Sequence, residues 1–111
     1  MKKIYYLKTC NTCQRILKNM DTSPYTLQEI KSNPITVKQL EEIYNLTNSY
    51  EVLFSRRAKK YQQMDLKNEA LNEQDYKQLI LDEYTFLKRP VIINNNEVYV
   101  GNTKKRVDKN N

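Results

Sequence analysis

The amino-acid sequence predicts one α/β domain, residues 1–111, built on a mixed β-sheet. Near the N-terminus, a short apolar run, a stretch of helical spacing and a second short run give the order strand, helix, strand. Near the C-terminus, two apolar runs separated by an asparagine-rich turn are typical of a β-hairpin. The segment between these units, about residues 35–85, has helical patterning and is predicted to be a helical insertion.

The first two predicted strands flank a helix. Residues 4–7, Ile-Tyr-Tyr-Leu, are of aromatic and aliphatic types that favour strands. Four apolar side chains then recur at the spacing of one helix face: Cys13, Ile16, Leu17 and Met20. The sequence Asp-Thr-Ser-Pro at residues 21–24 ends this helix, and residues 25–30 alternate as a second strand. One face of that strand is expected to carry Tyr25, Leu27 and Glu29.

The predicted insertion contains several helical segments. Thr36 and Gln39 form a capping box at the start of the first helix. The apolar face of that helix carries Val37, Leu40, Ile43 and Tyr44. Residues 50–54 predict a short helix that leads into the basic run 56–60. Asn72 is the expected N-cap of the last helix, and its apolar side chains are Leu71, Tyr76, Leu79, Ile80 and Tyr84.

The last predicted elements are the two hairpin strands. Residues 91–93 and 98–100 are apolar runs of strand-forming types, joined by an asparagine-rich turn at 94–96. The tail from Asn102 onward is polar and basic. It is expected either to hold a short helical piece or to fray.

The two cysteines of the chain, Cys10 and Cys13, stand where the first strand meets the first helix. A strand followed by C-x-x-C at a helix start is the arrangement of thioredoxin-like redox sites, and thioredoxin-like folds share a βαβ unit and a β-hairpin. The sequence therefore predicts this fold. Free N–H groups and a partial positive charge at the helix N-terminus favour the thiolate, so Cys10 is the candidate nucleophile. The alternative is an inert, partly buried cysteine.

Cys13 is open to two interpretations. It lies one helical turn from Cys10, within reach for a disulfide, and could resolve a sulfenic acid or a mixed disulfide. It also heads the apolar face of the first helix, and buried core cysteines are common.

Composition and charge narrow the function classes. Histidine is absent, and two cysteines alone do not make a structural zinc site, so no metal site is expected. The net charge of +6 favours anionic partners, or serves solubility alone. The N-terminal apolar run is too short for a signal-peptide core or a membrane span, so a cytoplasmic protein outside the membrane is expected. Thiols there are kept reduced, and a lone C-x-x-C is catalytic or sensing more often than structural.

Direct nucleic-acid binding is not expected, although the chain has a basic run and nine tyrosines. Several of these tyrosines fall on predicted apolar helix faces: Tyr44, Tyr76 and Tyr84. No base-stacking signature of a nucleic-acid-binding motif is visible.

Three segments together resemble one family. They are Lys-Thr-Cys-Asn-Thr-Cys at 8–13, Leu-Phe-Ser-Arg-Arg-Ala-Lys-Lys-Tyr at 53–61, and Leu-Lys-Arg-Pro-Val-Ile-Ile at 87–93 followed by Val-Gly at 100–101. In this order and spacing they resemble the family of glutaredoxin-coupled arsenate reductases and Spx-type transcription regulators. The resemblance covers nearly the whole chain. It implies a thioredoxin-like fold with a helical insertion, and a cis peptide bond between Arg89 and Pro90 beside the active-site loop.

Two arginines are the candidate anion-binding residues. Arg89, next to Pro90, would stabilise the Cys10 thiolate and bind an oxyanion through its guanidinium fork. The alternative is a surface arginine beside a strand. Arg57 stands where regulator-like members of the family carry an arginine, although a basic run such as 56–60 is usually a solvated helix face.

The arsenate reductases of this family resemble one another in a His-x3-Cys-x3-Arg pattern and in three arginines for the oxyanion. Here Tyr6 and Gln14 occupy the two outer positions of that pattern. Of the three arginines only Arg89 matches, since the other positions read as Ser55 and Gly101. We therefore do not expect efficient arsenate reduction, because each charge-assisted hydrogen bond contributes about 1.5–3 kcal/mol.

Two functional hypotheses follow. In the first, the protein is a thiol-redox protein in which Cys10 attacks, Cys13 resolves and Arg89 holds the thiolate. A small thiol or redox protein is then the partner, and electrons come from glutathione with glutaredoxin or from thioredoxin, without a bound cofactor. In the second, the protein is a redox-switched adaptor without turnover that binds the RNA polymerase α-subunit, as the family's regulators do. A monomer is expected in both cases.

Overall fold

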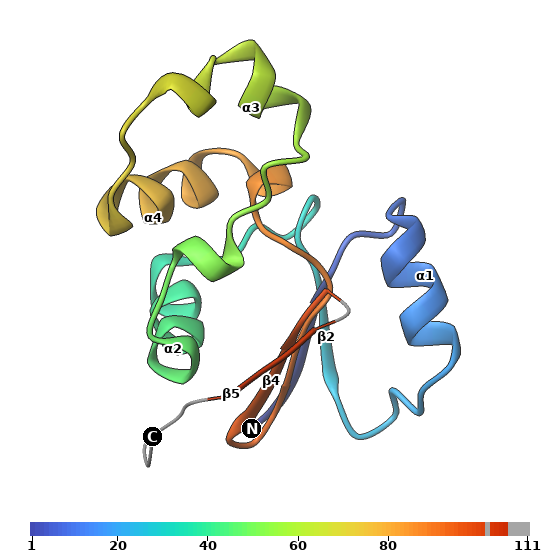
Figure 1. Ribbon diagram of the computed structural model, residues 1–111. Helices are drawn as coiled ribbons and strands as arrows, with labels where there is room; N and C mark the ends of the chain where they lie inside the picture. Colours follow the sequence, from blue (N-terminus) through green and yellow to red (C-terminus); the bar gives the residue numbers. More distant parts are fainter. Residues whose placement is uncertain (102, 107–111) are drawn as a thin grey trace.

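A five-stranded mixed sheet forms the centre of the structure (Figure 1). The computed structural model describes residues 1–101 and 103–106. The strands are β1 Lys2–Tyr6, β2 Thr26–Glu29, β3 Val91–Asn94, β4 Glu97–Val100 and β5 Thr103–Arg106. Their order in the sheet is β2-β1-β3-β4-β5. Only the β1–β2 pair is parallel among these strands, so the predicted mixed sheet is confirmed.

The parallel pair β1 and β2 is connected by α1 Asn11–Lys18. Parallel neighbours require a crossover connection, which a helix usually provides. α1 lies on one side of the sheet and α2 Val37–Thr47 on the other (Figure 1). The strand–helix–strand unit predicted from the N-terminal pattern is therefore present, and it places the start of α1 at one end of the sheet.

Between β2 and β3 the chain is helical. The elements are α2, η1 Glu51–Leu53, α3 Lys59–Gln63, η2 Leu66–Asn68, α4 Glu73–Asp82 and η3 Tyr84–Phe86, where η marks a short 3-10 helix. α3 and α4 lie beyond one end of the sheet (Figure 1). Both predicted capping boxes form, with Thr36 capping α2 and Asn72 capping α4. No helix in the described ranges is long and apolar enough to cross a membrane.

The main core lies between the sheet and the inserted helices. Its buried side chains come from both, and include Leu40, Ile43, Leu53, Phe54, Ile80, Phe86, Val91 and Ile93. Phe54 stacks on Phe86 with ring centroids 4.9 Å apart, which joins two distant parts of the insertion. Val37, predicted on the apolar face of α2, is instead 50% exposed, because the buried stripe of α2 begins one turn later at Leu40.

β2 buries a polar side chain. The face predicted to carry Tyr25, Leu27 and Glu29 is the more exposed one, whereas Gln28 is buried. The Nε2 of Gln28 donates to the Oε1 of Gln39 at 3.1 Å, and the Nε2 of Gln39 donates back to the Oε1 of Gln28 at 2.8 Å. A buried amide needs such partners. The pair ties the edge strand to the first turn of α2.

β5 corrects the prediction of a helical or frayed tail, as far as residue 106. It pairs antiparallel with β4, with Val100 opposite Thr103. Gly101, in the turn before it, has φ of 60°, a left-handed conformation that glycine adopts without strain. β5 takes up hydrogen-bonding groups that β4 would otherwise leave open at the sheet edge. The rest of the predicted tail lies outside the described residues.

Candidate functional site

The turn from β1 into α1 places Cys10 at the N-terminal end of the helix. Cys10 is the N-cap residue of α1, with φ −82° and ψ 120°. Its N–H donates to the carbonyl oxygen of Leu7 at 3.1 Å, and its carbonyl oxygen accepts from the N–H of Gln14 at 3.0 Å. The first-turn N–H groups of a helix have no partner within the helix. The Cys10 thiol therefore stands beside these donors, at the position that the sequence predicts.

Two side chains hold the loop that precedes Cys10. The Nε2 of Gln14 donates to the carbonyl oxygen of Lys8 at 2.9 Å, and the N–H of Lys8 donates to the Oε2 of Glu29 at 3.0 Å. Glu29 also accepts from the N–H of Ser32 at 2.9 Å. Backbone donation, first from Lys8 and then from Ser32, lowers the pKa of Glu29 to about 2. The sequence did not predict Gln14 or Glu29 as loop anchors, since both contacts cross between elements.

Cys10 and Cys13 are both free thiols and lie in contact. Each thiol shifts the pKa of the other: Cys13 lowers that of Cys10, and Cys10 raises that of Cys13. Cys13 is 1% exposed, whereas Cys10 is partly exposed. The pair is therefore within reach of a disulfide, and Cys10 is the member that a reagent from solvent can approach. Both interpretations of Cys13 apply, since it is a core side chain and a neighbour of Cys10.

The surroundings give the two thiols opposite acidities. Burial acts to raise the pKa of Cys10, but the polar N–H and thiol groups of Cys13, the charge of Arg89 and the N–H of Thr12 together lower it below its ordinary value. Burial raises the pKa of Cys13 to about 12, despite an opposing effect of the Leu7 backbone. The negative charge of Cys10 adds to that rise. Cys10 therefore ionises more readily than an ordinary cysteine, and Cys13 less readily.

The sheet topology brings Arg89 to the cysteines. β1 and β3 are antiparallel, with Tyr5 opposite Val91, so the end of β1 and the start of β3 lie at the same end of the sheet. Arg89 lies in the loop that leads into β3, and its peptide bond to Pro90 is cis, which confirms the expectation from the family resemblance. The charge of Arg89 acts on both thiols.

Backbone carbonyl groups hold the guanidinium of Arg89. Its Nη1 donates to the carbonyl oxygen of Leu87 at 2.7 Å and to that of Thr85 at 3.0 Å. Its Nε is buried and has no hydrogen-bond partner among the described residues. Because the backbone fixes Nη1, the guanidinium is held in place, and its Nε–H is a donor that no described residue uses.

A cleft of about 600 Å³ opens beside Arg89. It is lined by Thr12, Phe54, Ser55, Arg56, Arg57, Lys88, Arg89, Val100 and Gly101. Arg57 is exposed there and, within residues 1–101, makes no hydrogen bond or ion pair. Arg56 instead donates to Glu51 at 2.9 Å and to the hydroxyl of Tyr76 at 3.0 Å. Of the predicted basic run, Arg57 is therefore the guanidinium that stays available in the cleft.

Two further residues line the cleft that were not predicted from the sequence as site residues, Thr12 and Lys88. Thr12 lies between the cysteines, and its N–H also contributes to the lowered pKa of Cys10. Lys88 directly precedes Arg89. Adjacency in sequence to a predicted residue was the one signal that could have identified either of them.

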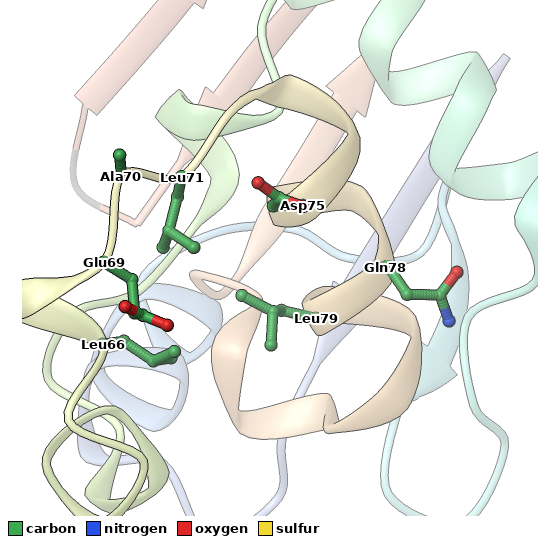
Figure 2. A pocket seen from close by; sticks show the side chains of 7 residues that line it. All are labelled: Leu66, Glu69, Ala70, Leu71, Asp75, Gln78 and Leu79. Carbon is green, nitrogen blue, oxygen red and sulfur yellow. The ribbon is translucent and has the colours of Figure 1, made fainter.

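A second hollow, of about 390 Å³, lies between η2 and the first turns of α4 (Figure 2). In Figure 2 the side chains of Leu66, Leu71 and Leu79 are turned toward this hollow and that of Gln78 is turned away. None of the predicted site residues lines it. In the part of the chain that the structure describes, no group of three or more His, Cys, Asp or Glu side chains is placed to hold a metal ion.

A mixed sheet, a C-x-x-C pair at the start of α1 and a cis-proline loop beside it define a thioredoxin-like thiol protein. A sequence profile of the ArsC family matches residues 5–110. The chain belongs to the ArsC family, as the three sequence segments indicate.

Curated relatives of similar sequence are named as regulators. The global transcriptional regulator Spx 1 of Bacillus cereus is 30% identical over 104 residues, which cover 91% of this chain and 79% of the relative. The global transcriptional regulator Spx of Staphylococcus aureus is 29% identical over 105 residues, with the same coverage of both chains.

Solved structures share the fold. A protein named YFFB superposes with a TM-score of 0.78 at 19% identity, covering 91% of this chain and 90% of that one. An arsenate reductase from Vibrio cholerae superposes with a TM-score of 0.69 at 12% identity, covering 97% of this chain and 90% of that one. At these identities the likeness concerns the fold alone, and it confirms the predicted thioredoxin-like α/β class.

Replacing Arg89 by Gln is expected to raise the pKa of Cys10, because it removes the cation that acts on this thiol. The rate of Cys10 alkylation against pH, followed by mass spectrometry, measures that pKa. The control Lys18→Gln removes an exposed cation from the far end of α1 and should leave the profile at the wild-type position. An unchanged profile in Arg89→Gln would contradict the electrostatic role of Arg89.

Glu29 is expected to make the free energy of unfolding depend on pH. Its folded pKa of about 2 lies below the ordinary value of 4.5, so its stabilisation is present above pH 4.5 and is lost as the pH falls toward 2. Urea unfolding across this window should show a shallower acid loss for Glu29→Gln than for wild type. The control Glu69→Gln changes an exposed carboxylate elsewhere and should retain the wild-type slope. Equal slopes in all three proteins would show that Glu29 does not anchor the loop.

Proposed function

We propose that the protein is a thiol-redox protein in which Cys10 attacks and Cys13 resolves. The observation that carries this proposal is the pairing at the start of α1, where a buried Cys13 thiol lies one helical turn from a partly exposed Cys10 thiol and lowers its pKa. An accessible, ionisable thiol beside a protonated, shielded one is the arrangement that a two-cysteine exchange needs. A cytoplasmic location, where thiols are kept reduced, belongs to this proposal.

In the first step, the Cys10 thiolate attacks one sulfur of a disulfide substrate. A mixed disulfide forms on Cys10 as the substrate S–S bond breaks, and the other half leaves as a thiolate that takes a proton from water. The N–H groups of Cys13 and Thr12 and the charge of Arg89 stabilise the Cys10 thiolate before the attack. These groups together outweigh the opposing effect of burial, so the pKa of Cys10 lies below its ordinary value.

In the second step, Cys13 loses its proton and attacks the sulfur of Cys10. The Cys10–Cys13 disulfide forms, and the second half of the substrate leaves as a thiolate. The first step removes the negative charge of Cys10 that helps keep Cys13 protonated, so Cys13 becomes easier to ionise once the mixed disulfide exists. A dithiol donor, either glutathione with glutaredoxin or thioredoxin, then returns two electrons and restores both thiols.

The residues of the cleft are less suited to binding arsenate than to accepting a disulfide substrate. Ser55 and Gly101 line it at two positions where the family's arsenate reductases carry arginines. Gln14, at another position that departs from their pattern, is bonded to the loop backbone. Arg89 and Arg57 are left to hold an oxyanion. Arsenate turnover is therefore expected to be slow compared with disulfide exchange.

A second function is favoured by the relatives of similar sequence, which are named global transcriptional regulators. In this alternative the protein is an adaptor without turnover, and its partner is the C-terminal domain of the RNA polymerase α-subunit. The Cys10–Cys13 pair then acts as the switch between two binding states. Direct contact with nucleic acid is not part of either proposal.

Exposure of the wild-type protein to oxidised glutathione should produce the Cys10–Cys13 disulfide, seen in mass spectrometry as a loss of two hydrogens. Cys13→Ser should stop at a glutathione adduct on Cys10, because the resolving thiol is missing. Cys10→Ser should form neither product. An adduct on Cys13 in wild type, or no product in any variant, would exclude Cys10 as the attacking thiol.

The adaptor alternative is tested with the purified C-terminal domain of the α-subunit. It predicts different affinities for the oxidised and reduced wild-type protein, measured by titration. Cys13→Ser, which cannot close the disulfide, should bind like the reduced protein under both conditions. The alternative is excluded if neither redox state binds while the protein turns over a disulfide substrate.

A further inference from the structure

The cleft beside Arg89 is cationic, and the thiolate of Cys10 is a negative charge near it that oxidation removes. Arg57, Lys88 and Arg89 line it, and none of its lining residues, all in the described part of the chain, is acidic. The charge interaction between Cys10 and Arg89 connects the cleft to the cysteine pair. The charge state of Cys10 therefore enters the electrostatic potential that an anion in the cleft experiences.

Arg89 is suited to respond to the cysteines without moving. The carbonyl groups of Thr85 and Leu87 hold its Nη1. Its buried Nε has no hydrogen-bond partner among the described residues, so the guanidinium has a donor that this part of the chain does not use. When the Cys10 thiolate is present, its negative charge offsets part of the positive charge of Arg89, so Arg89 attracts a second anion less strongly.

We propose that formation of the Cys10–Cys13 disulfide turns this cleft from a weak into a strong binding site for an anion. The ligand is a tetrahedral oxyanion or a carboxylate, because these groups match the paired N–H donors of a guanidinium. The inference rests on the proposed thiol function, since the disulfide is its switch. It adds to that function a ligand whose affinity reports the redox state of the pair.

The charge change follows from the balanced reaction. Conversion of one thiolate and one thiol to a disulfide releases two electrons and one proton. The electrons pass to the disulfide substrate, which takes up that proton and one more from water and leaves as two thiols. The reduced site carries the negative charge of Cys10 and the oxidised site does not, so the charge beside Arg89 rises by one unit. Repulsion of an incoming anion and competition for Arg89 are removed together.

The coupling acts in both directions. An anion that binds the oxidised protein more tightly must stabilise the disulfide by the same factor. One unit charge at about 10 Å in a medium of effective dielectric constant about 20 gives a factor of about ten. A tenfold factor lowers the reduction potential of the Cys10–Cys13 couple by about 30 mV.

Calorimetric titration with sodium sulfate, at constant ionic strength and above the measured pKa of Cys10, tests the proposal. Oxidised wild type is expected to bind sulfate about tenfold more tightly than reduced wild type. Cys10→Ser lacks the thiolate and should bind under reducing conditions as tightly as oxidised wild type. Arg57→Gln should weaken binding in both states, whereas the control Lys18→Gln, outside the cleft, should leave both affinities unchanged.

Mass spectrometry of the titrated samples separates two kinds of failure. If no disulfide forms, the thiol function is wrong, and the comparison of Cys10→Ser with reduced wild type still decides whether the thiolate weakens anion binding. If the disulfide forms and sulfate binds equally well to both states, or to neither, the redox control of the cleft is wrong and the thiol function stands.

Discussion

The turn between β1 and α1 is the constraint on which the rest of the site depends. β1 ends at Tyr6 and α1 begins at Asn11, so the chain passes from strand to helix within a short loop, and Cys10 takes the N-cap position. The first-turn N–H groups have no partner within the helix, and those of Thr12 and Cys13 lower the pKa of Cys10. Cys13 follows one turn later, which brings its thiol against Cys10. The backbone position thus sets both the acidity of Cys10 and the identity of its neighbour.

The sheet supplies the remaining part of the site from a distant part of the chain. Because β1 and β3 are adjacent and antiparallel, the loop after β1 and the loop before β3 meet at one end of the sheet. The inserted helices between β2 and β3 do not disturb this meeting, since they pack on the side of the sheet opposite α1 and beyond its end (Figure 1). The loop between η1 and α3 contributes Ser55 and Arg57 to the rim of the cleft. The insertion can therefore alter the ligand of the cleft while the cysteine pair and Arg89 keep their arrangement.

Features that depend on neighbouring residues could be predicted from the sequence, and features that depend on distant partners could not. The capping box at Thr36 and the helix start at Cys10 are local patterns, and both are present. The burial of Gln28 needs Gln39 from another element to complete its hydrogen bonds, which no alternation of side chains in β2 indicates. In the site, Arg56 and Arg57 look equivalent in sequence, but the side chain of Arg56 is bonded to side chains of two other elements, η1 and α4.

The charges around the two sulfurs favour exchange between sulfur atoms over reduction of a bound oxyanion. A site that reduces an oxyanion must stabilise the charge on several oxygens while a thiolate approaches, which calls for more than one fixed cation. Arg89 is the cation whose charge lowers the pKa of Cys10, and Ser55 and Gly101 bring no charge to the cleft. A disulfide presents neutral sulfur to the thiolate, so one guanidinium and the helix N–H groups suffice to hold the charge. The buried Cys13 then lies where it can capture the mixed disulfide, because it is already in contact with the sulfur that carries it.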